Sequence, residues 1–236
     1  MDIKLDTVYN CDCMELMEEM RRGGIMANLL LTDIPYNAIN KHISNGKRQL
    51  SKGNADIITF DLHEFLAIAD EIVADNFVIF CEFEQISEIT LFFKEKGYLT
   101  RLLVWEKRNP TPLNGEFGYL SGIETAVYAR KPKGTFNAFC KNTVFRHKSG
   151  ENSIHPTMKP LSLWYELLND LTNKGDIVLD TCMGSFTTAV ACNKLQRHFI
   201  GAELDKDYFE KGQKRLQTEL KQKSIFDLAG VSSEKI

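Results

Sequence analysis

The chain has 236 residues, of which 43% are apolar and 26% are charged, and its 29 Lys and Arg against 32 Asp and Glu give a net charge of −3. This mild acidity argues against a protein that binds nucleic acid through its overall charge, because such binding comes mainly from Lys and Arg contacts to phosphates. The length predicts one domain over residues 1–236. No apolar run approaches the roughly 18 residues of a membrane span, and the N-terminus lacks a signal peptide, so we expect no membrane partner and a cytoplasmic location.

Short apolar runs alternate with stretches of helical periodicity, which is typical of a parallel sheet covered by helices. In chain order the sequence predicts a strand at 7–10, a helix at 14–22, a strand at 28–33, a helix at 62–74, a strand at 76–81, a helix at 85–96, strands at 100–105 and 125–129, a helix at 160–172, a strand at 176–180, a helix at 187–194, a strand at 198–202 and a helix at 206–222. The expected fold class is α/β: a Rossmann-like, seven-stranded, mostly parallel sheet with helices on both faces.

The six cysteines are scattered, and no two of them have the C-x-x-C spacing of a zinc or redox site. Cys11 and Cys13 are the closest pair, and small half-buried residues of a strand or turn explain them better than a metal site does. We therefore expect reduced thiols and no metal.

Two long segments without regular pattern, 37–55 and 131–153, are more typical of functional loops than of simple connections. Residues 37–55 contain four basic and no acidic residues, and residues 125–150 contain six basic and no acidic residues, so the remaining chain must carry a charge of −13. Aromatic residues are interleaved in the second segment, as in nucleic-acid-binding grooves. The candidate nucleic-acid contacts in the two loops are Lys41, Lys47, Arg48, Lys52, Lys131, Lys133, Lys141, Arg146 and Lys148.

The run Leu29–Asn37 is apolar until it ends in Asp33-Ile34-Pro35-Tyr36. Ligands of open α/β sheets bind at such carboxyl ends of strands. Pro35 restricts Ile34 to extended geometry and so determines how the Ile34 carbonyl is presented. A carboxylate, a carbonyl and an aromatic plane together suit a flat ring that carries an amino group.

A second strand ends at Asp180 and is followed by a turn and a helix that starts near Thr187. We call residues 180–187 the cofactor loop. The loop has only Gly184, whereas a dinucleotide fingerprint needs three glycines. Glu203 ends the next strand 23 residues later, where an acid accepts from ribose hydroxyls. A nucleoside cofactor without a pyrophosphate therefore fits better than NAD.

The segment His155-Pro156-Thr157-Met158-Lys159-Pro160 opens the next predicted helix. Pro160 suits a first helical turn, and His155 or Lys159 could bind a carboxylate together with the helix N-terminus.

Together, Asp-Ile-Pro-Tyr at 33–36, His-Pro-Thr-Met-Lys-Pro at 155–160, Asp-Thr-Cys-Met-Gly-Ser-Phe-Thr at 180–187 and Glu203 resemble the DNA amino-methyltransferases that use S-adenosylmethionine. The order, with the catalytic tetrapeptide first, is similar to their permuted beta class. The resemblance spans nearly the whole chain, from Asn10 to Glu203.

The resemblance implies that Asp33 and the Ile34 carbonyl accept from the exocyclic amine of a flipped base, that Pro35 shapes this turn and that Tyr36 stacks on the base. It places the S-adenosylmethionine methionine beside the cofactor loop, the ribose at Glu203, the adenine at Asp12 and the methionine carboxylate at His155 and Lys159. The implied cofactor-loop contacts are Asp180, Met183, Gly184, Ser185, Phe186 and Thr187.

Two residues depart from the family pattern. Ile34 replaces a first proline, with little loss expected because the role belongs to a backbone carbonyl. Phe186 replaces a second glycine, where its ring either blocks the cofactor or takes the place of the ring that Cys182 has removed.

The sequence thus predicts a site-specific DNA adenine-N6 methyltransferase of the kind found in restriction-modification. The alternatives are cytosine-N4 methylation, an RNA methyltransferase, and a non-catalytic nucleic-acid-binding member of the fold. Members of the class often form homodimers, although no residue here indicates an interface.

Overall fold

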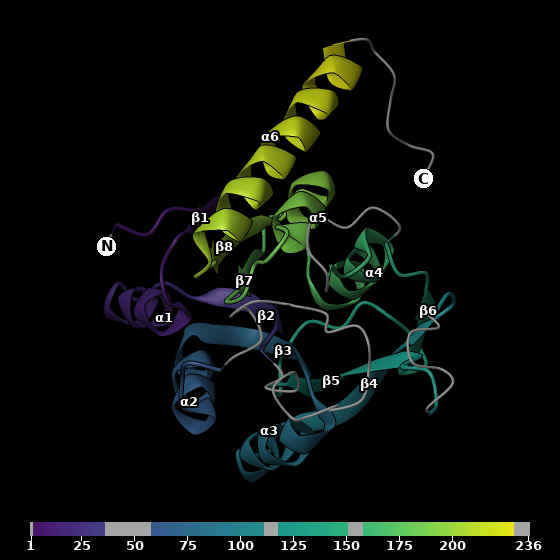
Figure 1. Ribbon diagram of the computed structural model, residues 1–236. Coiled ribbons are helices and arrows are strands. Elements are labelled where there is room, and N and C mark those ends of the chain that lie inside the picture. The colour runs from purple at the N-terminus through teal and green to yellow at the C-terminus, as the bar shows by residue number, and fades with distance from the viewer. Residues whose placement is uncertain (1, 36–57, 111–117, 151–157, 229–236) are drawn as a thin grey trace.

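A computed structural model describes residues 2–35, 58–110, 118–150 and 158–228. The chain alternates strands with helices, as Figure 1 shows. In chain order the elements are β1 (Thr7–Tyr9), α1 (Cys13–Arg22), β2 (Ala27–Asp33), α2 (Leu62–Ile72), β3 (Val73–Cys81), α3 (Phe83–Glu95), β4 (Leu99–Lys107), β5 (Ile123–Arg130), β6 (Val144–His147), α4 (Leu161–Leu171), β7 (Ile177–Asp180), α5 (Thr187–Leu195), β8 (His198–Ala202) and α6 (Lys206–Leu228).

The described strands form one eight-stranded sheet in the order β1-β8-β7-β2-β3-β5-β4-β6. Only β5 is antiparallel to its neighbours β3 and β4, so the predicted mostly parallel α/β sheet is confirmed. All seven predicted strands are present, but the prediction of seven was one too few. The eighth strand, β6, lies inside the 131–153 segment that was expected to be irregular and pairs in parallel with β4.

Helices cover both faces of the sheet, as predicted. One core packs α1, α2 and α3 against the first face, and a second core packs α4 and α5, with residues of α6, against the other. β2 contributes to both cores, because Leu30 faces the first and Leu29 and Leu31 face the second. Burial on both faces explains why the sequence of this central strand is almost continuously apolar.

Helix ends match their local sequence signals. Asp12 caps α1 by accepting from Met14 N at 2.8 Å. α3 begins two residues before the predicted start, because Glu82 and Gln85 form a capping box. α2 ends at Ile72, and β3 follows directly, so the predicted helix to residue 74 was slightly too long.

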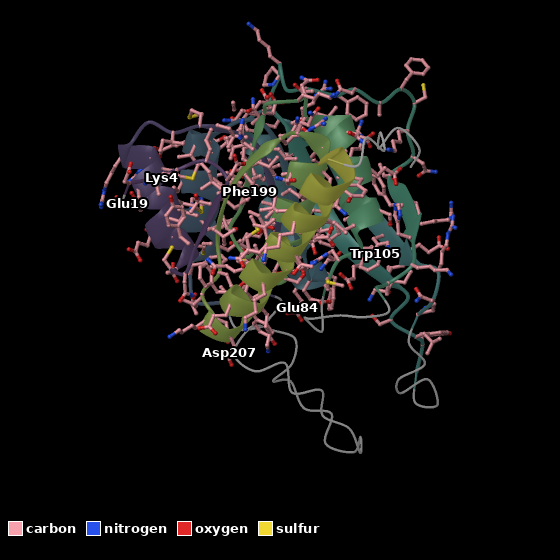
Figure 2. The ribbon with its side chains drawn as sticks, turned by 90° about the horizontal axis from the view of Figure 1, so that it is seen from above. Lys4, Glu19, Glu84, Trp105, Phe199 and Asp207 are labelled. Atoms are coloured by element: carbon pink, nitrogen blue, oxygen red, sulfur yellow. The ribbon has the colours of Figure 1, made fainter. Side chains whose placement is uncertain are left out.

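The parallel strands deliver their carboxyl ends to one edge of the sheet, which we call the carboxyl edge. In Figure 2, Glu84 and Asp207, which lie near the starts of α3 and α6, are on the same side of the molecule. Both helices follow strands that end at the carboxyl edge. Among the described residues, none of the helices is long and apolar enough to cross a membrane.

Candidate active site

Four acids predicted to act together meet at the carboxyl edge. Asp33 ends β2, Asp180 ends β7, and Glu203 and Asp12 follow β8 and β1. These four strands are neighbours and run parallel to one another. The structure therefore brings residues from opposite ends of the sequence to one edge.

The turn after β2 is held by backbone and side-chain contacts. Ile34 is buried, and its N–H donates to the Phe80 carbonyl of β3 at 3.2 Å. Gln85 of α3 donates from Nε2 to the Pro35 carbonyl at 3.3 Å. Sequence reasoning missed Gln85, whose only signal is its place in the capping box. Tyr36, the predicted stacking residue, lies outside the described residues.

Lys159 lies against Asp33. Its side chain is only 3% exposed, and its ammonium forms an ion pair with Asp33 and a second one with Glu124 Oε2 at 2.9 Å. Burial alone would lower the pKa of Lys159, but the two carboxylates raise it above its ordinary value. The sequence predicts Lys159 at a cofactor carboxylate, and this contact stays a prediction. In the structure its ammonium pairs with two protein carboxylates. His155 lies outside the described residues.

Asp180 braces the cofactor loop from inside the protein. Its carboxylate is buried and accepts from Thr188 Oγ1 at 2.5 Å and from Cys182 N at 3.1 Å. Burial raises the pKa of Asp180 to about 6.

Glu203 joins the cofactor loop to the end of β8. Its Oε2 accepts from Gly184 N at 2.7 Å and its Oε1 accepts from Asp205 N at 2.9 Å. Burial raises its pKa, although the two backbone N–H groups act in the opposite direction. Each oxygen keeps a second lone pair, so the carboxylate can still accept from a hydroxyl.

Phe186 turns its ring away from the carboxyl edge. It adopts a left-handed conformation, with φ of 62°, at the start of α5, and its side chain is fully buried. The ring lies 5.9 Å from that of Phe209 and packs under Gly212 of α6, where an added Cβ would come within 2.3 Å of it. A left-handed residue before the helix is the role that glycine performs elsewhere. The ring therefore does not fill the space beside the cofactor loop.

Arg215 of α6 is a second residue that the sequence reasoning missed. Its guanidinium donates to the Ser185 carbonyl at 2.8 Å, to Ser185 Oγ at 3.2 Å and to Thr187 Oγ1 at 3.1 Å. Burial lowers its pKa. Met183 N donates to the Ala202 carbonyl at 2.9 Å, so the loop is held at both ends.

The five predicted nucleic-acid contacts that the structure describes lie in different places. Lys131 follows β5 and lies beside the start of β3, at the edge of the sheet opposite to Asp33. Its ammonium donates to the carbonyls of Asp70 and Val73 at 2.7 and 2.6 Å. The structure therefore places Lys131 at the end of the sheet opposite to Asp33. Lys141 pairs with Glu166 and Asp170 of α4, and Arg146 with Glu106, whereas Lys133 and Lys148 are exposed. Four predicted contacts lie outside the described residues: Lys41, Lys47, Arg48 and Lys52.

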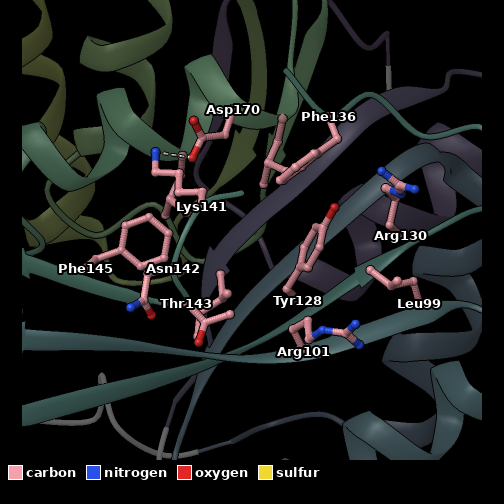
Figure 3. Close-up of a pocket in the computed structure, with 13 residues that line it drawn as sticks. Leu99, Arg101, Tyr128, Arg130, Phe136, Lys141, Asn142, Thr143, Phe145 and Asp170 are labelled. Carbon is pink, nitrogen blue, oxygen red and sulfur yellow. Dashed lines mark hydrogen bonds and ion pairs between the residues drawn. The ribbon is translucent and has the colours of Figure 1, made fainter. Parts of the chain in front are cut away.

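A cavity of about 250 Å³ lies between β4, β5 and α4, and Figure 3 shows Tyr128, Phe136 and Arg130 in its wall. Leu99 and Arg130, which also line it, pair at the amino-terminal end of β3. The cavity is therefore remote from Asp33. Within the described part of the chain, no group of three or more acids, histidines or cysteines is placed to hold a metal ion.

The known proteins that are similar to this chain are DNA methyltransferases. A family model for DNA methylases of the N6/N4 type matches residues 136–214. The type II methyltransferase M2.MboI of Moraxella bovis is 25% identical over 260 residues, covering 94% of each chain. The type II methyltransferase M2.DpnII of Streptococcus pneumoniae is 26% identical over 242 residues, covering 90% of each.

Solved structures are similar over the same range. The crystal structure of a complex of M1.HpyAVI with SAM is 32% identical, with a TM-score of 0.70, covering 89% of this chain and 99% of that chain. The cytosine-N4-specific PvuII DNA methyltransferase has a TM-score of 0.67 and covers 89% of this chain and 85% of that one. Its identity is 17%, so it bears on the fold alone.

Proposed function

Because the chain belongs to the N6/N4 family of S-adenosylmethionine-dependent DNA methyltransferases, we propose that it methylates adenine N6 and that Asp33 is the residue that receives the target amine. The observation that carries the proposal is Asp33 at the end of β2, beside the cofactor loop that follows β7. Adenine is favoured over cytosine because Asp opens the tetrapeptide. A non-catalytic role rested on Phe186 obstructing the cofactor, and its ring is buried under α6 instead.

The described residues fit the cofactor. Glu203 offers acceptor lone pairs for ribose hydroxyls, and Asp12 follows β1, the next strand along the sheet. The backbone of Gly184 and Ser185 is positioned by Glu203 and Arg215. We propose that these residues, with Asp180 bracing the loop from below, hold the cofactor, and that His155 contributes from the segment before α4.

S-adenosylmethionine supplies a methyl group on a positively charged sulfur. Asp33 and the Ile34 carbonyl are two acceptors that would hold the exocyclic amine and orient its lone pair toward that methyl group. In the transfer, a nitrogen–carbon bond would form as the sulfur–carbon bond breaks, which would leave the sulfur neutral and the nitrogen positive. Asp33 offsets this charge and takes the proton, which then passes to solvent. Tyr36 would stack on the flipped base, which offsets part of the few kcal/mol that flipping costs.

The test is methyl transfer from labelled S-adenosylmethionine to duplex DNA, followed by digestion to nucleosides that separates N6-methyladenine from N4-methylcytosine. We expect N6-methyladenine from the wild-type protein and a loss of at least about 100-fold in Asp33→Asn, because the amide cannot take the proton. Asp75→Asn, the same change at the opposite edge, is the matched control and should retain activity. Full activity in Asp33→Asn would refute the assigned role, and N4-methylcytosine as the product would refute the base. Single-stranded DNA and RNA as acceptors test the RNA alternative.

A further inference from the structure

Four charged side chains form a row that ends at Asp33, and we call it the charge row. Lys107 Nζ lies 2.8 Å from Glu124 Oε1, Glu124 Oε2 lies 2.9 Å from Lys159 Nζ, and Lys159 forms an ion pair with Asp33. The four residues come from β4, β5, the segment before α4 and β2. The row brings together parts of the chain that are far apart in sequence.

The charge row is too buried to be an ordinary surface salt bridge. The side chains of Lys107, Glu124 and Asp33 are 17–20% exposed, and that of Lys159 is 3% exposed. Removing charges from water costs several kcal/mol per ion unless partners compensate, so the alternating signs are needed for any of the four to be charged there. Consistent with this, the two lysines lower the pKa of Glu124 against the opposing effect of its burial.

We propose that Glu124 is a positioning residue for methyl transfer, which shares the charge of Lys159 and so keeps Asp33 a competent proton acceptor. This inference rests on the proposed role of Asp33. A lysine paired with Asp33 alone would hold the carboxylate in place but weaken it as an acceptor. The negative charge of Glu124 offsets part of the effect of the Lys159 ammonium on Asp33. The positive charge of Lys107 in turn weakens this effect of Glu124.

The charge row predicts effects of opposite sign on Asp33 when the charge of Glu124 or that of Lys107 is removed. Removing the charge of Glu124 removes its opposing effect on the Lys159 ammonium, so Asp33 holds a proton less tightly. Removing the charge of Lys107 leaves Glu124 acting more strongly on Lys159, so Asp33 holds a proton more tightly. A purely structural role would damage the site in the same direction in both variants.

Other titratable groups also act on Asp33, and the experiment must leave them unchanged. Among the described residues outside the charge row they include Cys81 of β3 and Asp180 of β7. Cys81 and Asp180 stay in place in both variants, so a difference in sign between the variants comes from the charge row.

The experiment measures the single-turnover rate of methyl transfer against pH at saturating S-adenosylmethionine and DNA. In Glu124→Gln we expect the acidic limb to move about one pH unit lower and the plateau rate to fall roughly 10-fold. In Lys107→Gln we expect the limb to move higher by about half a unit, because Lys107 is further from Asp33. Calorimetry should give cofactor affinities within about twofold of wild type for both, since neither residue contacts the proposed cofactor site.

Glu106→Gln is the matched control, because Glu106 is a carboxylate of β4 that pairs with the exposed Arg146 outside the charge row. It should retain the wild-type profile. The inference would be overturned if the acidic limbs of the pH–rate profiles of Glu124→Gln and Lys107→Gln moved in the same direction. It would also be overturned if the profile of Glu124→Gln equalled that of Glu106→Gln. If Glu124→Gln does not fold, Lys107→Gln decides alone, and a limb that moves lower or stays in place overturns it. An inactive wild-type protein, or an active Asp33→Asn variant, would instead defeat the proposed function.

Discussion

Asp180 ends β7 with both carboxylate oxygens turned into the protein. One oxygen accepts from Thr188 of α5 and the other from Cys182 N, so the side chain ties the cofactor loop to the helix that follows it. Thr188 also accepts from Trp164 Nε1 of α4 at 2.6 Å. A buried carboxylate is costly to ionise even with these donors, and its pKa is raised to about 6.

This raised pKa predicts how stability depends on pH. Between about pH 4 and pH 6 the folded protein keeps a proton on Asp180 that the unfolded chain releases, so the unfolding free energy falls as the pH rises. The change from the ordinary value of 3.8 to about 6 corresponds to about 3 kcal/mol. Asp180→Asn removes this contribution. The unfolding free energy of wild type minus that of Asp180→Asn, from urea titrations, should therefore fall by about this amount between pH 4 and pH 7.

Thr188→Val provides the companion measurement. It keeps the carboxylate of Asp180 but removes a hydrogen bond that lowers its pKa. The fall in stability should then extend to higher pH than in wild type. A difference between wild type and Asp180→Asn that stays constant from pH 4 to pH 7 would contradict the explanation.

At the scale of elements, the contact between α5 and α6 explains how the cofactor loop accommodates a phenylalanine. The left-handed conformation of Phe186 costs about 1–2 kcal/mol for a residue other than glycine. Burying its ring contributes about 1.5–3 kcal/mol in the opposite direction. The ring fits because Gly212 has no side chain, so a glycine on α6 compensates for the missing one in the loop.

Gly212→Ala should therefore destabilise the protein, although alanine is the better helix former by about 1 kcal/mol. The new Cβ would come within 2.3 Å of the Phe186 ring, and such overpacking typically costs about 1–3 kcal/mol. Thermal and urea unfolding measure the loss. Phe186→Leu in the same chain should recover part of it, because a smaller side chain leaves room for the Cβ.

Gln213→Ala is the control for this substitution, since Gln213 is exposed on the same turn of α6. It should leave stability unchanged or raise it slightly. If Gly212→Ala lowered the unfolding free energy equally in the wild-type protein and in Phe186→Leu, positions 186 and 212 would not interact.

The elements also show which features a sequence can predict. The central strands β2, β3, β7 and β8 are apolar because both faces of the sheet are covered there, so local pattern is enough to find them. β6 is the outermost strand next to β4, and its exposed Arg146 beside buried Phe145 gives only a short, weak alternation of polar and apolar residues. The pairing of Lys159 with Asp33 joins residues 126 positions apart, and no local pattern contains it. The direction of the Phe186 ring depends likewise on Gly212 of another helix.

At the scale of the whole molecule, the position of the basic residues matters more than their number. The acid-free segment of residues 125–150 begins at the carboxyl edge with Thr125, reaches the opposite edge at Arg130, and returns to the carboxyl edge only after β6. Lys131 is half-buried against Asp70, whereas Lys148 follows β6 and is exposed. Of the basic residues in this segment, only those near the end of β6 lie on the side where the target base must enter.

This arrangement predicts which cations set the salt dependence of DNA binding. A protein of net charge −3 that contacts phosphates near its site should lose affinity steeply with salt, and each lost contact should reduce the slope by about one. We expect Lys148→Gln to flatten the slope in this way. Lys47→Gln and Arg48→Gln, in the segment outside the described residues, should do the same. Lys131→Gln should leave the slope unchanged, because its ammonium is bound to backbone carbonyls at the opposite edge. Fluorescence anisotropy of a labelled duplex between about 50 and 200 mM salt measures the slopes. Flattening by Lys131→Gln as large as that by Lys148→Gln would mean that DNA reaches around the sheet to its far edge.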